Sequence, residues 1–404
     1  MEEKSRTAGL IPFSVCFSVG AVLFSSHAGG GFASGNQAYQ NFVTTGWLAP
    51  FSALLAMLLF ILTIREAMLM YNTRGLNSYK QLFETLYHPL DKLEWLFELF
   101  FYIMVLMAVG AAIATAASTL TSLLGLKYEL GIVVVGAIVL VLTIFGAGLV
   151  RKASTVMGLG ILVCAITIFC IGIVKAPDLI GVFRTSFQGE GFSRLPQALL
   201  NAFTYAGFQC VVIPTMIVCG KPLLNKRACS QSMWISFGLN AVSLVLSVLM
   251  LMGWASFFTQ QENGTTIPTL TVCQAGMEMD WLTVVYSACL LLCLISTGVT
   301  TVFGFVARFE KLKVLRRVKS GPVRSAIVSS FIIILAMTVS LMGLTNIIKY
   351  GYGYCGYLAI AIIIVPFLTV GVVKNRRFLM EHPEYRGVSG LKARRMAAAS
   401  KKEV

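Results

Sequence analysis

The sequence predicts an all-α polytopic membrane protein. Of its 404 residues, 57% are apolar and only 12% are charged, and the mean hydropathy is +0.81. A typical soluble domain carries about 25% charged residues. Apolar runs of more than about 18 residues, enough to cross a bilayer core of roughly 30 Å, recur from one end of the chain to the other. We therefore expect a chain that crosses the membrane many times.

Apolar runs bounded by glycine, proline and charged residues predict ten spanning helices. We expect them near residues 10–43, 47–71, 92–124, 130–149, 152–175, 194–219, 229–257, 281–307, 325–345 and 354–374. The chain then divides into an N-terminal segment, two five-helix halves joined by an external loop, and a basic tail. The N-terminal segment is residues 1–9, the two halves are residues 10–175 and 194–374, the external loop is residues 176–193, and the basic tail is residues 375–404.

The net charge of +15 is explained by membrane orientation and does not require a nucleic-acid partner. With the N-terminus inside and ten spans, most basic residues fall on the cytoplasmic side, as the positive-inside rule demands. The exceptions among the 32 Lys and Arg residues are Lys127, Lys175, Arg184, Arg194 and Lys349. We therefore expect a plasma-membrane protein with both termini in the cytoplasm and the lipid bilayer as its surroundings.

The first predicted helix has an unusual centre. Residues 25–35 read Ser-Ser-His-Ala-Gly-Gly-Gly-Phe-Ala-Ser-Gly, with four glycines in positions 29–35. Each glycine in a helix interior costs roughly 1 kcal/mol. Non-helical backbone at membrane depth is tolerated only where it faces protein or a water-filled cavity. Close helix packing could also explain glycines, but three in a row flanked by Ser and His favour a binding site.

The sixth predicted helix, which opens the second half, has a similar interruption. Residues 204–210 read Thr-Tyr-Ala-Gly-Phe-Gln-Cys, and Pro214 follows. Two halves of five helices each must insert with opposite topology. Corresponding interruptions in the two halves are typical of a transporter whose site lies between inverted repeats.

These motifs also carry a family resemblance. Gly29 to Gly35, together with the Tyr-Ala-Gly-Phe-Gln stretch of the sixth helix and Ile295-Ser296-Thr297-Gly298 of the eighth, resembles the YkvI-like bacterial membrane proteins. Those proteins are regarded as distant members of the amino acid–polyamine–organocation superfamily. The resemblance covers about residues 10–375 and implies the five-plus-five LeuT-type fold with helices 1 and 6 broken. His27 departs from the family pattern, which has a small or apolar residue there.

The resemblance implies a sodium site between the first helix and the eighth. Carbonyls near Ser25 and Ala28 would meet hydroxyls of either Thr300 and Thr301 or, one turn away, Ser296 and Thr297. Hydroxyls of this kind often donate to their own helix instead. We expect sodium as the only metal, with no transition-metal site and no organic cofactor, because none of the cysteines shows metal-ligand spacing.

A small solute would bind beside the ion. Free amides at the start of the outer half of helix 1 suit a carboxylate, and aromatic and amide side chains of helices 3 and 6 could line the opposite wall. The candidate solute-binding residues are Ser26, His27, Gly29, Gly30, Gly31, Phe32, Tyr102, Tyr205, Phe208 and Gln209.

Three functions remain open at this point. The first is sodium-coupled symport of a small amino-acid-like or amine solute by alternating access. The second is proton coupling through His27, the one titratable group at membrane depth, since an unperturbed imidazole titrates at about pH 6.5. The third is a sensor or receptor that keeps the transporter fold without transport. We do not expect an enzyme, because metalloprotease, nucleophile-elbow and Walker motifs are absent from the sequence. Solute identity, direction of transport and oligomeric state are left open by the sequence.

Overall fold

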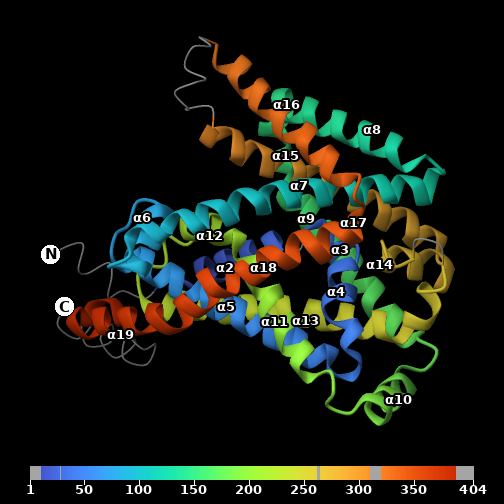
Figure 1. Cartoon of the computed structure of the whole chain (residues 1–404), viewed down its shortest axis with the longest axis horizontal. Helices are drawn as coiled ribbons and strands as arrows, with labels where there is room; N and C mark the ends of the chain where they lie inside the picture. The colour runs from blue at the N-terminus through green and yellow to red at the C-terminus, as the bar shows by residue number, and fades with distance from the viewer. Residues whose placement is uncertain (1–10, 28, 262–263, 310–319, 388–404) are drawn as a thin grey trace, which may run out of the picture.

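The computed structural model describes residues 11–27, 29–261, 264–309 and 320–387. These residues form helices and connecting loops, with no β-strand among them (Figure 1). Helices occupy all ten predicted ranges, but the predicted boundary between the fourth and fifth, at residues 149–152, falls inside α9, because residues 128–174 are helical without interruption. The predicted N-terminal segment 1–9 and the end of the predicted basic tail lie outside the described residues.

The first half of the chain contains the elements up to the long loop after residue 174. They are α2 (Phe13–His27), α3 (Gly30–Ala33), α4 (Asn36–Asn41), η1 (Val43–Leu48), α5 (Ala49–Thr73), α6 (Tyr79–Tyr87), η2 (Asp91–Leu93), α7 (Glu94–Leu124), α8 (Tyr128–Val141), η3 (Leu142–Gly146) and α9 (Ala147–Val174).

The segment 176–193, predicted as an external loop, instead contains the helix α10 (Leu179–Glu190), which follows α9 at a bend of 76°. The remaining elements are α11 (Leu195–Gln209), η4 (Cys210–Val212), α12 (Ile213–Cys219), α13 (Lys226–Phe258), α14 (Pro268–Thr271), η5 (Val272–Gly276), α15 (Asp280–Phe309), α16 (Gly321–Ser340), α17 (Leu344–Asn346), η7 (Ile347–Tyr352), α18 (Gly353–Ala359), η8 (Ile360–Ile364), η9 (Phe367–Gly371), α19 (Val372–Glu381) and η10 (Pro383–Arg386).

Eight helical segments among the described residues are long and apolar enough to cross a membrane, and a ninth is counted if the bent pair α9–α10 is one span. The first predicted span differs from the rest. Its apolar helix α2 has only 15 residues and is followed by two short pieces, α3 and α4. A multi-pass membrane protein is therefore confirmed, while ten spans and the inverted repeat stay predictions.

The helices pack in two groups. In the first group α13 packs against α2 and α5, and α11 packs against α5. In the second group α7 packs against α8, α15 and α16, which lie together at the top of Figure 1. Helix α9 contacts α13 of one group and α15 of the other, and α18 contacts α11 and α7. The broken segment α2–α3–α4 thus lies within the first group, with α3 reaching α7 and α15 of the second.

Local sequence explains where several helices start. Ser78 and Asn225 accept hydrogen bonds at the N-termini of α6 and α13 from the amides of Gln81 and Ala228, which have no partner within the helix. Asp178 caps α10 in the same way. Gly125 ends α7 in the left-handed conformation that glycine adopts without steric cost.

Candidate functional site

The glycine run breaks the first helix, as the sequence predicts. Helix α2 ends at His27, Gly29 forms a bend, and α3 begins at Gly30. A second interruption follows at Gly35, whose φ of 81° is in the left-handed region. We call residues 29–35 the helix-1 break.

The glycines of the helix-1 break differ in what surrounds them. A Cβ added to Gly31 would lie 2.3 Å from the Gln37 side-chain nitrogen, and one added to Gly35 would lie 2.3 Å from the Thr269 hydroxyl. A Cβ added to Gly29 would meet no atom within 4 Å. Gly35 is therefore required by its positive φ and close packing, whereas a side chain at Gly31 would displace Gln37 and one at Gly29 would meet open space.

His27 is the polar centre beside this open space. Its side chain is only 2% exposed. Its Nε2 atom lies 2.9 Å from the hydroxyl of Tyr205 on α11, so the hydrogen bond joins the first helix to the sixth. Among the described residues no hydrogen bond of good geometry reaches the buried Nδ1 atom, and the Asn240 side chain interacts with the ring. A buried polar atom without a partner costs about 1–3 kcal/mol, so a donor or acceptor brought in by a ligand would be stabilised there.

Asn240 on α13 lies against the His27 ring. Its amide nitrogen donates to the carbonyl and hydroxyl of Ser236, at 2.8 and 3.0 Å, and its Oδ1 atom is buried without a partner. Two neighbouring side chains from different helices thus each leave one polar atom unsatisfied. The surroundings of His27 therefore suit a small polar group of a ligand.

Aromatic rings enclose His27 and Tyr205. The His27 ring lies 5.2 Å from Phe32 and 6.2 Å from Phe60, measured between ring centroids. Tyr205 lies 4.9 Å from both Phe42 and Phe208. These distances are those of favourable edge and tilted aromatic contacts, so the polar groups are shielded by an apolar wall.

The sixth helix is interrupted later than its sequence suggests. Residues Thr204 to Gln209 stay in the α-helix α11, and the chain tightens into a 3₁₀ turn only at Cys210–Val212, which we call the helix-6 break. Pro214 opens α12 directly after it. Gly207 keeps the helix intact and serves packing instead, since a Cβ there would lie 2.7 Å from the carbonyl oxygen of Gly356 on α18.

The other predicted solute-binding residues of these two helices lie either beside Tyr205 on α11 or in the first helix. Phe208 and Gln209 are buried beside Tyr205, and Gln209 approaches its hydroxyl. The amide of Phe32 donates to the Gly29 carbonyl at 3.0 Å, which leaves the amides of Gly30 and Gly31 as those predicted to meet a carboxylate. The hydroxyl of Ser26 donates to the Val22 carbonyl.

Tyr102 on α7 is not brought to this cluster. Its ring packs against Phe101 and against Phe305 of α15, and its hydroxyl bonds to Glu98. Tyr102 lies only eight residues into α7, toward the end that meets α6, because α7 already starts at Glu94. Its predicted role in solute binding gains no support from these contacts.

The predicted sodium ligands on α15 are arranged along one helix. Thr297 donates its hydroxyl hydrogen to the Cys293 carbonyl and Thr300 donates to the Ser296 carbonyl, each at 2.8 Å. Ser296 is buried and Thr301 is half-buried. Ser25 is exposed, and Ala28 lies outside the described residues. The contact between α15 and the helix-1 break is made by Tyr286, whose hydroxyl donates to the Ala33 carbonyl.

Three side chains of the cluster were not predicted from the sequence: Asn240, Phe42 and Phe60. Phe60 lies in a long apolar run, where a cluster residue looks like any lipid-facing one, and Phe42 lies in the mixed segment between Asn41 and Thr44. Asn240 had a usable signal, because five polar residues of α13, which the structure buries, recur at helical spacing. They are Ser232, Ser236, Asn240, Ser243 and Ser247.

Comparisons with known proteins find the fold but no family. No family model and no curated protein matches the chain. A crystal structure of a mutant of the Eremococcus coleocola manganese transporter matches with a TM-score of 0.53 and 16% identity, over 88% of this chain and 78% of that one. The same transporter in complex with an aromatic bis-isothiourea substituted compound gives a TM-score of 0.51 and 12% identity, over 91% and 87%.

At such low identity this likeness is one of fold alone. The chain shares the fold of a membrane transporter, and the proteins matched are not enzymes, which agrees with the sequence prediction on that point. The YkvI-like resemblance and the LeuT-type repeat remain predictions.

Proposed function

We propose that this protein is a secondary active transporter that moves a small amino-acid-like or amine solute together with sodium by alternating access. In this proposal the two five-helix halves, residues 10–175 and 194–374, form an inverted repeat, and both termini are cytoplasmic. The solute lies at the helix-1 break and the ion lies between that break and α15.

The observation that carries the proposal is the helix-1 break itself, which begins two residues after the buried and incompletely bonded His27. Backbone that leaves the helix at membrane depth needs a partner, and a polar solute supplies one. The wall opposite is made by Tyr205 of the other broken helix, which already bonds His27 at 2.9 Å. A site at a helix break can change shape when the helix segments on either side of the break tilt, as alternating access requires.

The chemistry of the cluster supports an organic solute. The transporter it resembles in fold carries manganese in its name, and divalent manganese favours carboxylate ligands. The polar side chains around His27 include an imidazole, a phenol and carboxamides, from His27, Tyr205, Gln209 and Asn240. Among the described residues no group of three or more His, Cys, Asp or Glu side chains lies close enough to hold a metal ion. Hydrogen bonding to a neutral or zwitterionic solute fits these groups better.

The hydroxyls of α15 support sodium as the coupling ion. A threonine that donates its hydrogen to its own helix still presents oxygen lone pairs outward. The hydroxyls of Thr297 and Thr300 are held in this way. Ser296 and Thr301 would complete a set of neutral oxygen ligands with carbonyls of the helix-1 break, and Ser25 and Ala28 are the carbonyls we propose.

Proton coupling through His27 is the second candidate. It is favoured by one observation, the buried Nδ1 atom that lacks a partner. A protonated imidazole donates from both nitrogens, so Nε2 would donate to the Tyr205 hydroxyl while Nδ1 carried a second hydrogen into the site.

The thermal unfolding midpoint of the purified protein separates these candidates. It is measured in sodium, potassium and choline chloride at pH 5.5 and pH 7.5. An ion that binds only the folded state stabilises it by about 2.7 kcal/mol at a hundredfold excess over its dissociation constant. We expect a rise specific to sodium. A midpoint that changes with pH but not with sodium favours proton coupling through His27. A midpoint that changes with neither contradicts ion coupling and favours a sensor.

A further inference from the structure

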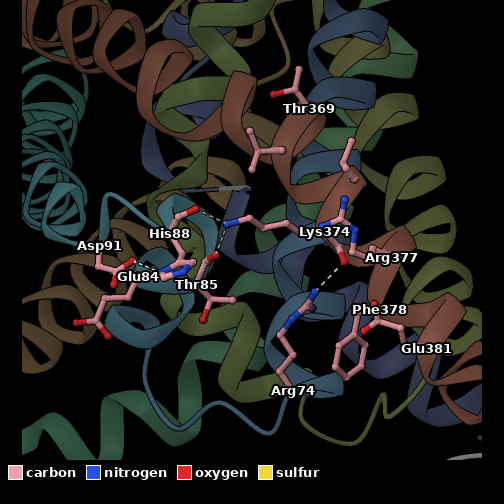
Figure 2. A pocket seen from close by; sticks show the side chains of 12 residues that line it. Arg74, Glu84, Thr85, His88, Asp91, Thr369, Lys374, Arg377, Phe378 and Glu381 are labelled. Atoms are coloured by element: carbon pink, nitrogen blue, oxygen red, sulfur yellow. Dashed lines mark hydrogen bonds and ion pairs between the residues drawn. The ribbon is translucent and has the colours of Figure 1, made fainter.

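A cleft lies at the end of the molecule where α5, α6 and α19 meet. It has a volume of about 850 Å³ (Figure 2). One wall is the end of α6 with η2, and the other is α19. Arg74, the residue directly after α5, closes the cleft between them. This cleft is distant in sequence from every residue of the helix-1 break.

The lining of the cleft changes from apolar to charged along α19. Val370 and Val373, within the predicted tenth span, are 43% and 60% exposed and border the cleft on the membrane side. Arg377, one turn later, marks the charged end. The cleft is therefore apolar at one end and charged at the other. A phospholipid has the same arrangement, with apolar acyl chains joined to a charged head group.

The two walls carry opposite charges. Glu84 and Asp91 line the α6–η2 wall, and Figure 2 shows them across the cleft from Arg377. Arg377 forms no ion pair with any described residue, whereas Asp91 lies 3.0 Å from His88 and Glu84 lies 4.0 Å from Lys80. Glu381 on the basic wall reduces the positive charge there. The cleft thus suits a ligand that carries both charges better than a purely anionic one.

Hydrogen bonds hold the walls in place. Lys374 reaches across from α19, and its Nζ atom donates to the carbonyls of Thr85, Leu86 and His88 at 2.9, 3.1 and 2.9 Å. Arg74 donates to the Asn375 side chain at 2.7 Å and lies 4.5 Å from the Phe378 ring centroid. Burial lowers the pKa of Arg74 to about 10, against the opposing effect of Glu66, so it remains charged at neutral pH. The cleft is therefore preformed, which reduces the entropic cost of binding.

Exposed apolar side chains beside the acidic wall mark the membrane surface. Leu90 is 64% exposed and Trp95 is 54% exposed, and they flank Asp91 in sequence. Tryptophan is enriched at the boundary between lipid and water. The charged end of the cleft is thus expected at the depth of the lipid head groups.

We propose that this cleft binds the head group of a zwitterionic phospholipid with a primary ammonium group. The phosphate would face Arg377 and Arg74, the ammonium would face Glu84 and Asp91, and an acyl chain would follow Val370 and Val373. Free phosphoethanolamine has the same charged groups. The exposed valines favour the lipid, because a free head group would leave that surface uncovered.

Native mass spectrometry of the full-length protein, stripped of lipid in detergent, tests the proposal. The probes are phosphatidylethanolamine, phosphatidylcholine and phosphatidylglycerol with identical acyl chains, and soluble phosphoethanolamine. We expect phosphatidylethanolamine to bind most tightly, because the choline head group has no N–H to donate and the glycerol head group has no cation. Equal binding of the three lipids would overturn the proposal, and displacement of the lipid by equimolar phosphoethanolamine would show that the site takes a free solute.

Exposed variants locate the site without disturbing the core. Arg377→Gln should weaken binding of all three lipids by about tenfold, the effect of losing one charge-assisted hydrogen bond. Glu84→Gln with Asp91→Asn should abolish the preference for ethanolamine over choline. The matched control is Arg376→Gln, an exposed residue on the same helix that does not line the cleft. An equal loss in the control would contradict the site. The assay needs no transport, so its result is independent of the proposed function.

Discussion

The two helix breaks use glycine in opposite ways. In the helix-1 break the backbone leaves the helix at Gly29 and again at Gly35, and Gly29 borders open space. In the sixth helix Gly207 remains helical and brings α11 into backbone contact with Gly356 of α18. The helix-6 break follows only at Cys210–Val212. The same residue type therefore opens one helix and tightens the packing of the other.

This difference assigns different roles to the two segments. The helix-1 break leaves the regular helix beside His27, whose Nδ1 atom is unsatisfied, while α11 supplies a firmly packed wall that presents Tyr205 toward His27. A mobile or open element facing a rigid one is a sensible arrangement for a binding site, because only one side must adapt. The predictions below test that division, beginning with the largest effect.

Gly207→Ala should destabilise the protein by about 2–3 kcal/mol. The added methyl group would meet the carbonyl oxygen of Gly356 at 2.7 Å, and backbone cannot move aside as a flexible side chain can. Thermal or denaturant unfolding in detergent measures the loss. Gly238→Ala on α13 is the control, because a Cβ there meets nothing within 4 Å and alanine favours a helix. Equal stability of the two variants would contradict the packing role of Gly207.

Tyr205→Phe should cost about 1–3 kcal/mol, because it leaves both nitrogens of buried His27 without a partner. The unfolding midpoint reports this loss. Tyr354→Phe, at an exposed tyrosine, should leave the midpoint unchanged. If Tyr205→Phe behaves like that control, the hydrogen bond between the two broken helices contributes nothing to the fold.

Gly29→Ala should change stability by less than about 1 kcal/mol and still remove solute binding, because its methyl group would occupy the open space. Gly31→Ala makes the contrast, since there the Gln37 side chain must move to make room. Midpoints with and without solute separate the two effects. Normal solute binding by a stable Gly29→Ala protein would place the solute elsewhere.

Thr300→Ala combined with Thr301→Ala should abolish any sodium-dependent rise of the midpoint, with little effect on the midpoint in choline. Thr338→Ala is the control, because that exposed threonine of α16 makes the same bond to its own helix, 3.0 Å from the Ile334 carbonyl. An unchanged sodium response in the double variant would remove these hydroxyls from the ion site, and Ser296 with Thr297 would be tested next.

The helix ranges could be predicted from the sequence because each apolar run is long enough to require a span. The helix-1 break could be predicted as well, since three consecutive glycines weaken a helix whatever its neighbours are. The helix-6 break was predicted one turn too early. There the decisive fact is the fit of Gly207 against Gly356, a contact between residues far apart in the chain that no local pattern reveals.

The candidate site shows the same limit. His27 and Tyr205 were predicted to line one solute site, and the hydrogen bond between them could not be predicted. Asn240 was overlooked because a single carboxamide among serines does not stand out, and Tyr102 was included because its distance from the break along α7 cannot be judged without packing. A helix break can be predicted from local sequence, whereas the contacts of a side chain depend on the fold.

The central claim is that the helix-1 break binds a solute whose movement is driven by an ion. Uptake into proteoliposomes tests it most directly, with a mixture of amino acids and amines offered under an imposed sodium gradient and the accumulated compounds identified by mass spectrometry. We predict accumulation of at least one compound by the wild-type protein in sodium, none in choline, and none by the stable Gly29→Ala variant. Absence of accumulation under sodium and proton gradients alike, or undiminished uptake by Gly29→Ala, would contradict the account.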